Sequence, residues 1–298
     1  MKYPKAVKIV EVSPRDGLQN EKQIIDVKDK LALINGLRTA GVKDIEVAGF
    51  VSPKWIPQLA DAKQVCAGLV RDEAANYSVL APNMKGLDGA IEAGMQQVAV
   101  FTAASESFNQ KNINCSIAES FDRFAPVMEK AQDLGISVRG YVSCVLGCPY
   151  EGEIDPKVVA QVAKKLYDMG CFEVSLGDTI GTGTPKAAQT MFELCAADVP
   201  TEKLALHFHD TYGQALANIH ACLSLGASVI DSSVAGIGGC PYAKGATGNV
   251  STENVVYMLH GMGIETGIDL SMLIETGRQI SEVLGRKPNS QVNNAWKF

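Results

Sequence analysis

The feature that most constrains the fold is a short pattern that returns along the whole chain. A helix-like stretch is followed by a glycine and then by a run of apolar residues. Glycine is favoured just after a helix because it adopts the left-handed conformation without a Cβ clash. Each repeat therefore predicts a helix that ends near the glycine and a buried strand after it. The pattern occurs at Gly41 before residues 45–47, Gly94 before 98–101, Gly135 before 137–142, Gly170 before 172–176 and Gly226 before 229–231.

Three further apolar segments, residues 8–12, 77–80 and 204–208, bring the number of predicted strands to eight. Helix starts agree with this division, because a capping residue precedes a proline at 155–156 and 184–185, and residues 116–119 fit a capping box. Eight alternating strand and helix units predict an α/β fold, the parallel (β/α)₈ TIM barrel. An open doubly wound sheet is the alternative, but no Gly-x-Gly-x-x-Gly follows the first strand.

We expect one catalytic domain over residues 1–298, because no linker or low-complexity segment interrupts the chain. Residues from about 270 are predicted to form one more helix and a polar tail. In a parallel barrel the active site lies at the C-terminal ends of the strands, so the residues at those ends are the candidates for chemistry.

Composition narrows the class of protein. Of 298 residues, 46% are hydrophobic and 20% charged, and the formal net charge is −6. This balance argues against nucleic-acid binding and against attachment to anionic membranes. The sequence contains no apolar run long enough for a transmembrane helix and no secretory signal, so no membrane partner is expected. Eight cysteines without a Cys-x-x-Cys pair are expected to be free thiols in a reducing cytosol, which predicts a cytoplasmic location.

The predicted seventh strand carries two of the four histidines of the chain, His207 and His209. Side chains two apart on a strand point the same way, and these two lie about 7 Å apart along it. Two imidazoles at a strand end can form half of a metal site. Two core histidines with satisfied hydrogen bonds are the other interpretation, and the pair alone does not decide between them. His220 and His260 fall in helix-like stretches and receive no role.

The ends of the other strands carry charged residues. Strand one runs into Arg15 and Asp16, which predict either an ion pair that closes the barrel or a metal carboxylate beside a cationic clamp. Glu46 lies inside an apolar strand, where a carboxylate is costly to bury unless it is paired, and Arg15 or Arg139 is its expected partner. Arg139 is interpreted first as a structural partner and second as a substrate contact. Asp178, at the end of strand six, is either a partner of a histidine or a helix cap.

After strand eight, residues 235–249 form a glycine-rich segment that ends at Asn249. Such a loop can move and lets the backbone approach a ligand. Asn249 offers an oxygen ligand, with a helix cap as its alternative role. Cys240 lies inside this segment, where a thiol can approach a reacting carbon. The tetrapeptide Gly-Cys-Pro-Tyr around Cys240 occurs a second time around Cys148. Cys148 lacks the glycine-rich surroundings and serves as the comparison.

Together these residues give a candidate metal site of Asp16, His207, His209 and Asn249. Two nitrogen and two oxygen ligands suit a divalent cation such as Mg²⁺ or Mn²⁺ better than a thiolate-rich zinc site would.

Four motifs give the chain a specific resemblance. They occupy residues 11–21, 50–55, 207–214 and 238–249, and together they resemble hydroxymethylglutaryl-CoA lyases, which belong to the DRE-TIM metallolyases. The resemblance implies that Asp16, His207, His209 and Asn249 hold the metal, and that Arg15 stabilises the thioester enolate. It also implies that Glu46 supports the site, that Cys240 acts from a mobile loop, and that the enzyme is a homodimer. One departure is Ala48-Gly49 before Phe50, where many members are expected to carry a hydroxyl residue.

The reaction implied by the resemblance is cleavage of 3-hydroxy-3-methylglutaryl-CoA to acetoacetate and acetyl-CoA, as in leucine degradation and ketone-body chemistry. The metal acidifies the tertiary hydroxyl, Asp16 or His207 takes its proton, and Cys240 protonates the acetyl-CoA carbanion. A lyase for a longer branched 3-hydroxyacyl-CoA is an alternative, as are a Claisen synthase of the same superfamily, an amidohydrolase-type metal hydrolase and a barrel that only binds a thioester.

Overall fold

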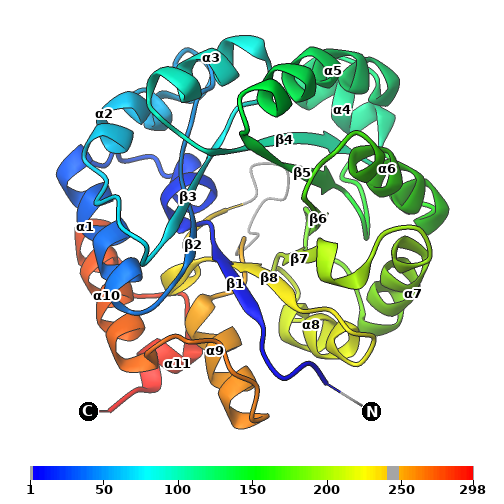
Figure 1. The fold of residues 1–298 in the computed structure, drawn as a ribbon. Coiled ribbons are helices and arrows are strands. Elements are labelled where there is room, and N and C mark those ends of the chain that lie inside the picture. The colour runs from blue at the N-terminus through cyan, green and yellow to red at the C-terminus, as the bar shows by residue number, and fades with distance from the viewer. Residues whose placement is uncertain (1–2, 240–247, 298) are drawn as a thin grey trace.

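The computed structural model describes residues 3–239 and 248–297. In these ranges eight parallel strands close into a barrel in which each strand pairs with the next and β8 pairs with β1 (Figure 1). The strands are β1 (Lys8–Glu11), β2 (Asp44–Gly49), β3 (Asn76–Leu80), β4 (Gln97–Ala103), β5 (Ser137–Ser143), β6 (Glu173–Asp178), β7 (Leu204–Phe208) and β8 (Val229–Ser232). The predicted (β/α)₈ barrel is confirmed.

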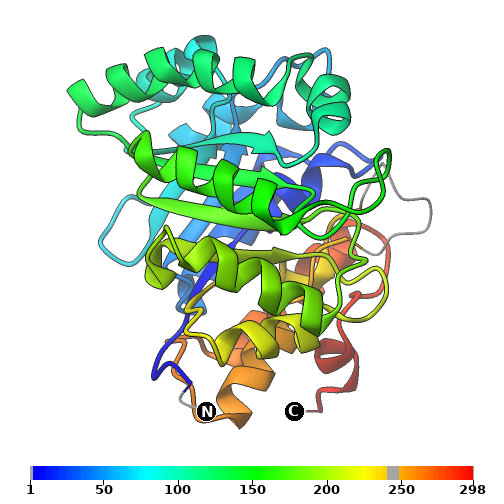
Figure 2. The same cartoon turned by 90° about the vertical axis from the view of Figure 1, so that its right-hand side faces the viewer.

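Helices surround this barrel and cover the outer faces of its strands (Figures 1 and 2). Those in the described ranges are α1 (Val27–Thr39), α2 (Ala62–Ala67), α3 (Met84–Glu92), α4 (Glu106–Ile113), α5 (Ile117–Asp133), α6 (Pro156–Asp168), α7 (Pro185–Ala196), α8 (Ala215–Leu223), α9 (Thr252–Gly261), α10 (Leu270–Val283) and α11 (Gln291–Ala295). Short 3₁₀ turns occur at η2 (Pro57–Leu59), η3 (Thr201–Lys203) and η4 (Val234–Gly236), and a π-helical turn at η1 (Ser13–Gly17). None of the helices in the described ranges is long and apolar enough to cross a membrane.

The predicted helix ends are present. The five glycines of the repeated pattern all have positive φ, from 68° at Gly94 and Gly135 to 101° at Gly170. Ser116 and Glu119 form the capping box of α5, and Asp155 accepts a hydrogen bond at the start of α6. Thr184 stands at the N-cap position of α7, but its side chain makes no capping hydrogen bond.

Two regions differ from the expectation. The chain after residue 270 forms two helices, α10 and α11, and not one helix with a tail. After β1 the chain coils into the π-helical turn η1, which no sequence pattern had indicated. Residues 287–296 of the supposed tail are ordered by contacts with α9 and α10, such as the Asn293 amide on the Glu253 carboxylate.

The barrel has an apolar outer layer, and its interior combines charged and polar side chains with a small apolar cluster of Val10, Val12, Ala205 and Val229. Val138, Val174 and Leu206 point outward into the large core between strands and helices. Their neighbours in the same strands point inward, and there Arg139 of β5 and Asp231 of β8 form an ion pair across the barrel. Strand alternation explains this division, because successive side chains lie on opposite faces. The polar interior leads directly to the C-terminal ends of the strands.

Candidate metal centre and active site

Arg15 and Asp16 reach the barrel mouth together because η1 is helical. On an extended strand two consecutive side chains would point to opposite faces. In a helical turn both can face the same side, and π-helical turns are frequent at functional sites. The Arg15 Nη1 donates to Asp16 Oδ1 at 2.8 Å. The sequence left open whether Arg15 and Asp16 form an ion pair or whether Asp16 binds a metal. The two roles are compatible, because the ion pair forms at the site itself.

Gly17, the last residue of η1, has a steric reason to be glycine. A Cβ at this position would lie 2.9 Å from the Ser233 hydroxyl and 3.0 Å from the carbonyl oxygen of Ile237. The backbone of η1 thus packs directly against the first residues after β8. This contact brings Asp16 next to the segment that leads to Asn249.

An acid and two histidines meet at the mouth of the barrel. His207 is in β7 and His209 follows it immediately, and their ring centroids lie 5.5 Å apart. The His207 Nε2 is 3.8 Å from Asp16 Oδ2. One ligand atom from each of these three residues can be chosen so that all lie within 4.8 Å of one another. Asp16, His207 and His209 are therefore close enough together to share a single ion.

Asn249 lies beside this group. Its backbone forms an isolated β-bridge with His209, which continues the line of β7 beyond its end. Its side-chain Nδ2 donates to Asp16 Oδ2 at 2.9 Å. Asn249 is buried and is not a helix cap, because Ser251 caps α9. The structure thus brings together all four residues predicted for the metal site.

Glu46 has the partner that the sequence suggested. Arg15 donates from Nε to Glu46 Oε2 at 2.7 Å, and its Nη2 lies 2.6 Å from the same oxygen. The Glu46 side chain is fully buried, and its Oε1 has no hydrogen-bond partner. The Tyr141 hydroxyl also donates to Glu46 Oε2, at 3.3 Å. The Arg15 guanidinium is therefore held from two sides, by Glu46 and by Asp16.

Arg139 lies deeper in the barrel than Arg15. Its nitrogens donate to Glu173, to the Tyr141 hydroxyl and to both oxygens of Asp231. Its side chain is 4% exposed. This geometry favours the first interpretation from the sequence, a structural partner, over a contact with substrate.

The electrostatics make Asp16 anionic and His209 neutral. Burial by itself raises the pKa of Asp16, but Arg15 and His207 outweigh it and lower the pKa to about 2. Burial lowers the pKa of His209 to about 4, and His207 contributes in the same direction. For His207, burial lowers the pKa, but the hydrogen bond with Asp231 and the charge of Asp16 outweigh it, so its pKa is raised.

The side chains fit a divalent cation. The Nδ1 of His209 is buried and has no hydrogen-bond partner. An ionised carboxylate and a neutral imidazole are the forms that bind metals. The donors are oxygen and nitrogen with no thiolate among the described residues of the cluster, which is the chemistry of Mg²⁺ and Mn²⁺ more than of structural zinc. A buried imidazole nitrogen without a hydrogen-bond partner, next to an anionic carboxylate, is what such an ion would satisfy.

The remaining sequence candidates are not part of the metal cluster or lie outside the described residues. Asp178 ends β6, and its Oδ2 accepts from the backbone N–H of Gly183, so it holds the turn before α7 and is not the cap of that helix. Burial raises its pKa to about 6. Cys148 is buried with its Sγ 3.0 Å from the Ser105 hydroxyl. Cys240 lies outside the described residues.

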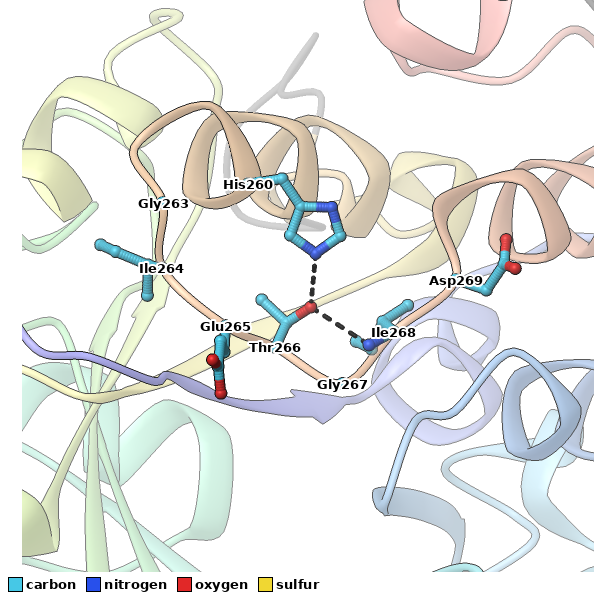
Figure 3. A pocket seen from close by; sticks show the side chains of 8 residues that line it. All are labelled: His260, Gly263, Ile264, Glu265, Thr266, Gly267, Ile268 and Asp269. Atoms are coloured by element: carbon cyan, nitrogen blue, oxygen red, sulfur yellow. Dashed lines mark hydrogen bonds between the residues drawn. The ribbon is translucent and has the colours of Figure 1, made fainter.

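His220 and His260 are in α8 and α9, away from the cluster, as expected. A surface pocket lies at the connection from α9 to α10, where His260 and Thr266 form a hydrogen bond of 2.9 Å (Figure 3). Glu265 in this connection pairs with Ala6, just before β1 begins. The pocket is therefore at the opposite end of the barrel from Asp16, and it is not the candidate active site.

Three residues of the site were missed by sequence reasoning: Tyr141, Ser175 and Asp231. The Oδ2 of Asp231 lies 3.2 Å from the Nδ1 of His207. Asp231 is therefore the carboxylate partner of a histidine, a role that the sequence had suggested for Asp178. A signal was present, because Asp231 sits in an apolar strand just as Glu46 does. Its pairing with a histidine followed only from strand register.

The fold and the site together define a barrel enzyme with its acid–histidine centre at the carboxyl ends of β1 and β7. Comparison with known proteins then identifies the family. The chain matches the protein-family model described as HMGL-like over residues 6–280. It is 57% identical over 295 residues to the "3-hydroxy-3-isohexenylglutaryl-CoA/hydroxy-methylglutaryl-CoA lyase" of Pseudomonas aeruginosa, covering 99% of this chain and 98% of that protein.

Two further comparisons agree. The chain is 59% identical over 292 residues to the mitochondrial hydroxymethylglutaryl-CoA lyase of Mus musculus, covering 98% of this chain and 90% of the relative. A crystal structure of an HMG-CoA lyase from Acinetobacter baumannii, in complex with coenzyme A and 3-methylmalate, superposes with a TM-score of 0.94 at 36% identity. That comparison covers 100% of this chain and 97% of the other. The chain belongs to the HMGL-like family and is an enzyme of its lyase class, as the motifs had predicted.

Proposed function

We propose that this enzyme cleaves 3-hydroxy-3-methylglutaryl-CoA to acetoacetate and acetyl-CoA. The observation that carries the proposal is the meeting of Asp16, His207 and His209 beside Arg15 at the carboxyl ends of the barrel strands. Relatives named for this reaction share more than half of their residues with the chain over nearly its full length. The complex of a related lyase with coenzyme A supports an acyl-CoA substrate.

The cofactor in this proposal is one divalent cation, Mg²⁺ or Mn²⁺, held by Asp16, His207, His209 and Asn249. When bound, it would polarise the oxygen atoms of the substrate and make the tertiary hydroxyl more acidic. The proton of this hydroxyl passes to the pair formed by Asp16 and His207, whose side chains lie 3.8 Å apart. Asp16 is the member that can accept it, because a neutral imidazole that gives its one lone pair to the cation has none left for a proton.

Arg15 meets the charge that develops on the thioester oxygen as the carbon–carbon bond breaks. A guanidinium held in a fixed position stabilises such charge more than a mobile one, because little reorganisation is needed during the reaction. Glu46 and Asp16 hold the Arg15 guanidinium in place, with contacts of 2.6 Å and 2.8 Å. Glu46 therefore acts through Arg15.

Cys240 is proposed to protonate the carbanion of acetyl-CoA. The described residues on either side of residues 240–247 lie next to the site. On one side the Asn20 amide donates to the carbonyl oxygen of Gly239 at 3.0 Å. On the other side, the carbonyl oxygen of Gly248 accepts a hydrogen bond from the Asp210 N–H, and the predicted ligand Asn249 follows Gly248 in the chain.

A second candidate substrate is a 3-hydroxyglutaryl-CoA with a longer branch at C3. The Pseudomonas relative is named for both an isohexenyl and a methyl substrate. In this chain Gly49 ends β2 next to the site, where an added Cβ would lie 3.1 Å from Leu59 and 3.8 Å from the Arg15 Cγ. These contacts are close packing, so Gly49 leaves no open surface at this point and does not itself favour either substrate. Comparison of kcat/KM for the two thioesters decides between the substrates.

A homodimer in the cytoplasm is the proposed state of the enzyme. The family resemblance supports the dimer, and the free thiols of the described cysteines support a reducing compartment. Sedimentation of the purified protein tests the first statement.

The experiment that tests the proposed function uses purified protein, hydroxymethylglutaryl-CoA and detection of acetyl-CoA. We expect release of acetyl-CoA with Mg²⁺ or Mn²⁺, loss of release in excess EDTA, and recovery when the cation is restored. Release that persists in EDTA would remove the metal from the mechanism. Condensation of acetyl-CoA with a 2-oxo acid, without cleavage, would favour a Claisen synthase.

A further inference from the structure

Asp231 lies directly behind His207, and its two carboxylate oxygens accept three hydrogen bonds and contact the His207 ring. Arg139 donates to both of them, at 2.9 Å from Nη1 to Oδ2 and 2.7 Å from Nη2 to Oδ1. The Ser175 hydroxyl donates to Oδ2 at 2.7 Å, and the Nδ1 of His207 lies 3.2 Å from the same oxygen. The Asp231 side chain has no exposed surface. Every contact of this carboxylate is therefore made inside the protein.

The position of this carboxylate is set by the sheet. His207 of β7 and Asp231 of β8 are direct partners in the parallel register. Both side chains point into the barrel, and a shift by one residue would turn Asp231 outward. Likewise Arg139 of β5 is the register partner of Glu173 of β6.

A line of ion pairs continues from Asp231 toward the other end of the barrel. The Nε of Arg139 donates to Glu173 Oε1 at 2.7 Å, and Lys8 contacts Glu173 Oε2 at 2.6 Å. A guanidinium can only donate, so both oxygens of Asp231 act as acceptors toward Arg139, and Oδ2 also accepts from the Ser175 hydroxyl.

We propose that Asp231 is a positioning residue that holds His207 as the tautomer protonated at Nδ1. A neutral imidazole has one N–H and one lone pair, so a proton fixed on Nδ1 leaves the lone pair on Nε2. The Nε2 is the atom that faces Asp16. Arg139 and Ser175 act through Asp231 and do not contact substrate. The inference rests on the proposed metal site, toward which it orients one ligand.

The first test compares Mn²⁺ binding by metal-free protein in the Asp231→Asn and Glu173→Gln variants, followed by electron paramagnetic resonance. Both variants remove one buried negative charge next to Arg139, but only the first changes the group that faces His207. An asparagine can donate to Nδ1 and so allow the other tautomer. We expect Asp231→Asn to weaken Mn²⁺ binding about 10- to 100-fold, and Glu173→Gln to leave it within about twofold of the parent.

Equal affinity in Asp231→Asn and the parent would overturn the inference, as would an equal loss in both variants, which is the result of a purely structural charge effect. If the parent protein binds no Mn²⁺, the proposed metal site fails, and with it the inference. If the parent binds Mn²⁺ and cleaves the thioester while Asp231→Asn binds normally, the inference alone fails.

The second test needs no variant of Asp231 and so does not depend on whether Asp231→Asn folds. Long-range ¹H–¹⁵N correlation spectra distinguish the two neutral tautomers of each histidine. The chain has four histidines, and a His207→Gln variant identifies the signals of His207. At alkaline pH, beyond the point at which the His207 signals stop changing with pH, we expect His207 to carry its proton on Nδ1. A proton on Nε2 would contradict the inference.

Discussion

At the scale of single residues, a few contacts decide the chemistry. The two histidines of β7 and the Arg15-Asp16 pair were visible in the sequence because polar residues at apolar strand ends are costly unless they serve a purpose. That these residues lie close together could be expected only from the barrel fold, which brings the carboxyl ends of its strands to one face. Asp231 was missed although an acidic residue in an apolar strand is a signal, because the identity of its partner depends on the residue opposite it in β7.

The proposed role of Cys240 predicts a clear separation of effects. Cys240→Ser should lower kcat for acetyl-CoA release about 10²- to 10⁴-fold, because a hydroxyl is a much weaker acid than a thiol. Mn²⁺ affinity should not change, since the thiol is not a predicted ligand. The matched control is Cys148→Ser, because the Cys148 Sγ lies 3.0 Å from the Ser105 hydroxyl and not at the metal cluster. Equal turnover in parent and Cys240→Ser would exclude the proton-donor role.

At the scale of elements, the site depends on how the turn after β1 meets the segment after β8. The sequence predicted all eight strands within a few residues, since apolar runs and terminal glycines mark them locally. It did not predict the π-helical form of η1 or the packing of α11 on α9. Those features depend on contacts between distant segments, such as Gly17 with Ile237 and Asn293 with Glu253.

Gly17→Ala tests the contact between η1 and the residues after β8. The added methyl group would overlap the Ser233 hydroxyl and the carbonyl oxygen of Ile237. We expect a loss of about 1–3 kcal/mol in the free energy of unfolding, as for other overpacked sites, together with weaker Mn²⁺ binding because Asp16 is displaced. Urea unfolding and Mn²⁺ titration measure the two effects. Gly261→Ala, at the end of α9 where a Cβ meets nothing within 4 Å, is the control; it should not lower the free energy of unfolding and should leave Mn²⁺ binding unchanged.

At the scale of the whole molecule, the barrel combines an apolar shell with a charged interior. Buried ion pairs such as Arg139 with Asp231 seldom add net stability, because desolvation offsets the attraction between the charges. Their presence along the barrel interior is better explained by the geometry they impose on His207 and Arg15. Stability comes instead from the apolar layer between strands and helices.

One buried carboxylate should make the stability of the whole fold depend on pH. Burial raises the pKa of Glu253 from 4.5 to about 7. The folded protein therefore holds this proton more tightly than the unfolded chain, and its stability falls as pH rises between these two values. Glu253→Gln should remove this loss, which amounts to about 3 kcal/mol.

Urea unfolding of Glu253→Gln between pH 5 and pH 8 gives the measurement, with Glu202→Gln, an exposed carboxylate, as the control. The parent and the Glu202 variant should lose stability over this range to a similar extent, and the Glu253 variant should lose less. An identical pH dependence in all three would show that Glu253 keeps its ordinary pKa.

The most direct test of the account is a Mn²⁺ titration of the metal-free enzyme, followed by electron paramagnetic resonance, in the parent and in His209→Ala. The account predicts one tightly bound Mn²⁺ per chain in the parent and at least about tenfold weaker binding in His209→Ala. His260→Ala, which alters a histidine at the far end of the barrel, should bind as the parent does. Unchanged binding in His209→Ala would contradict the assignment of the metal centre.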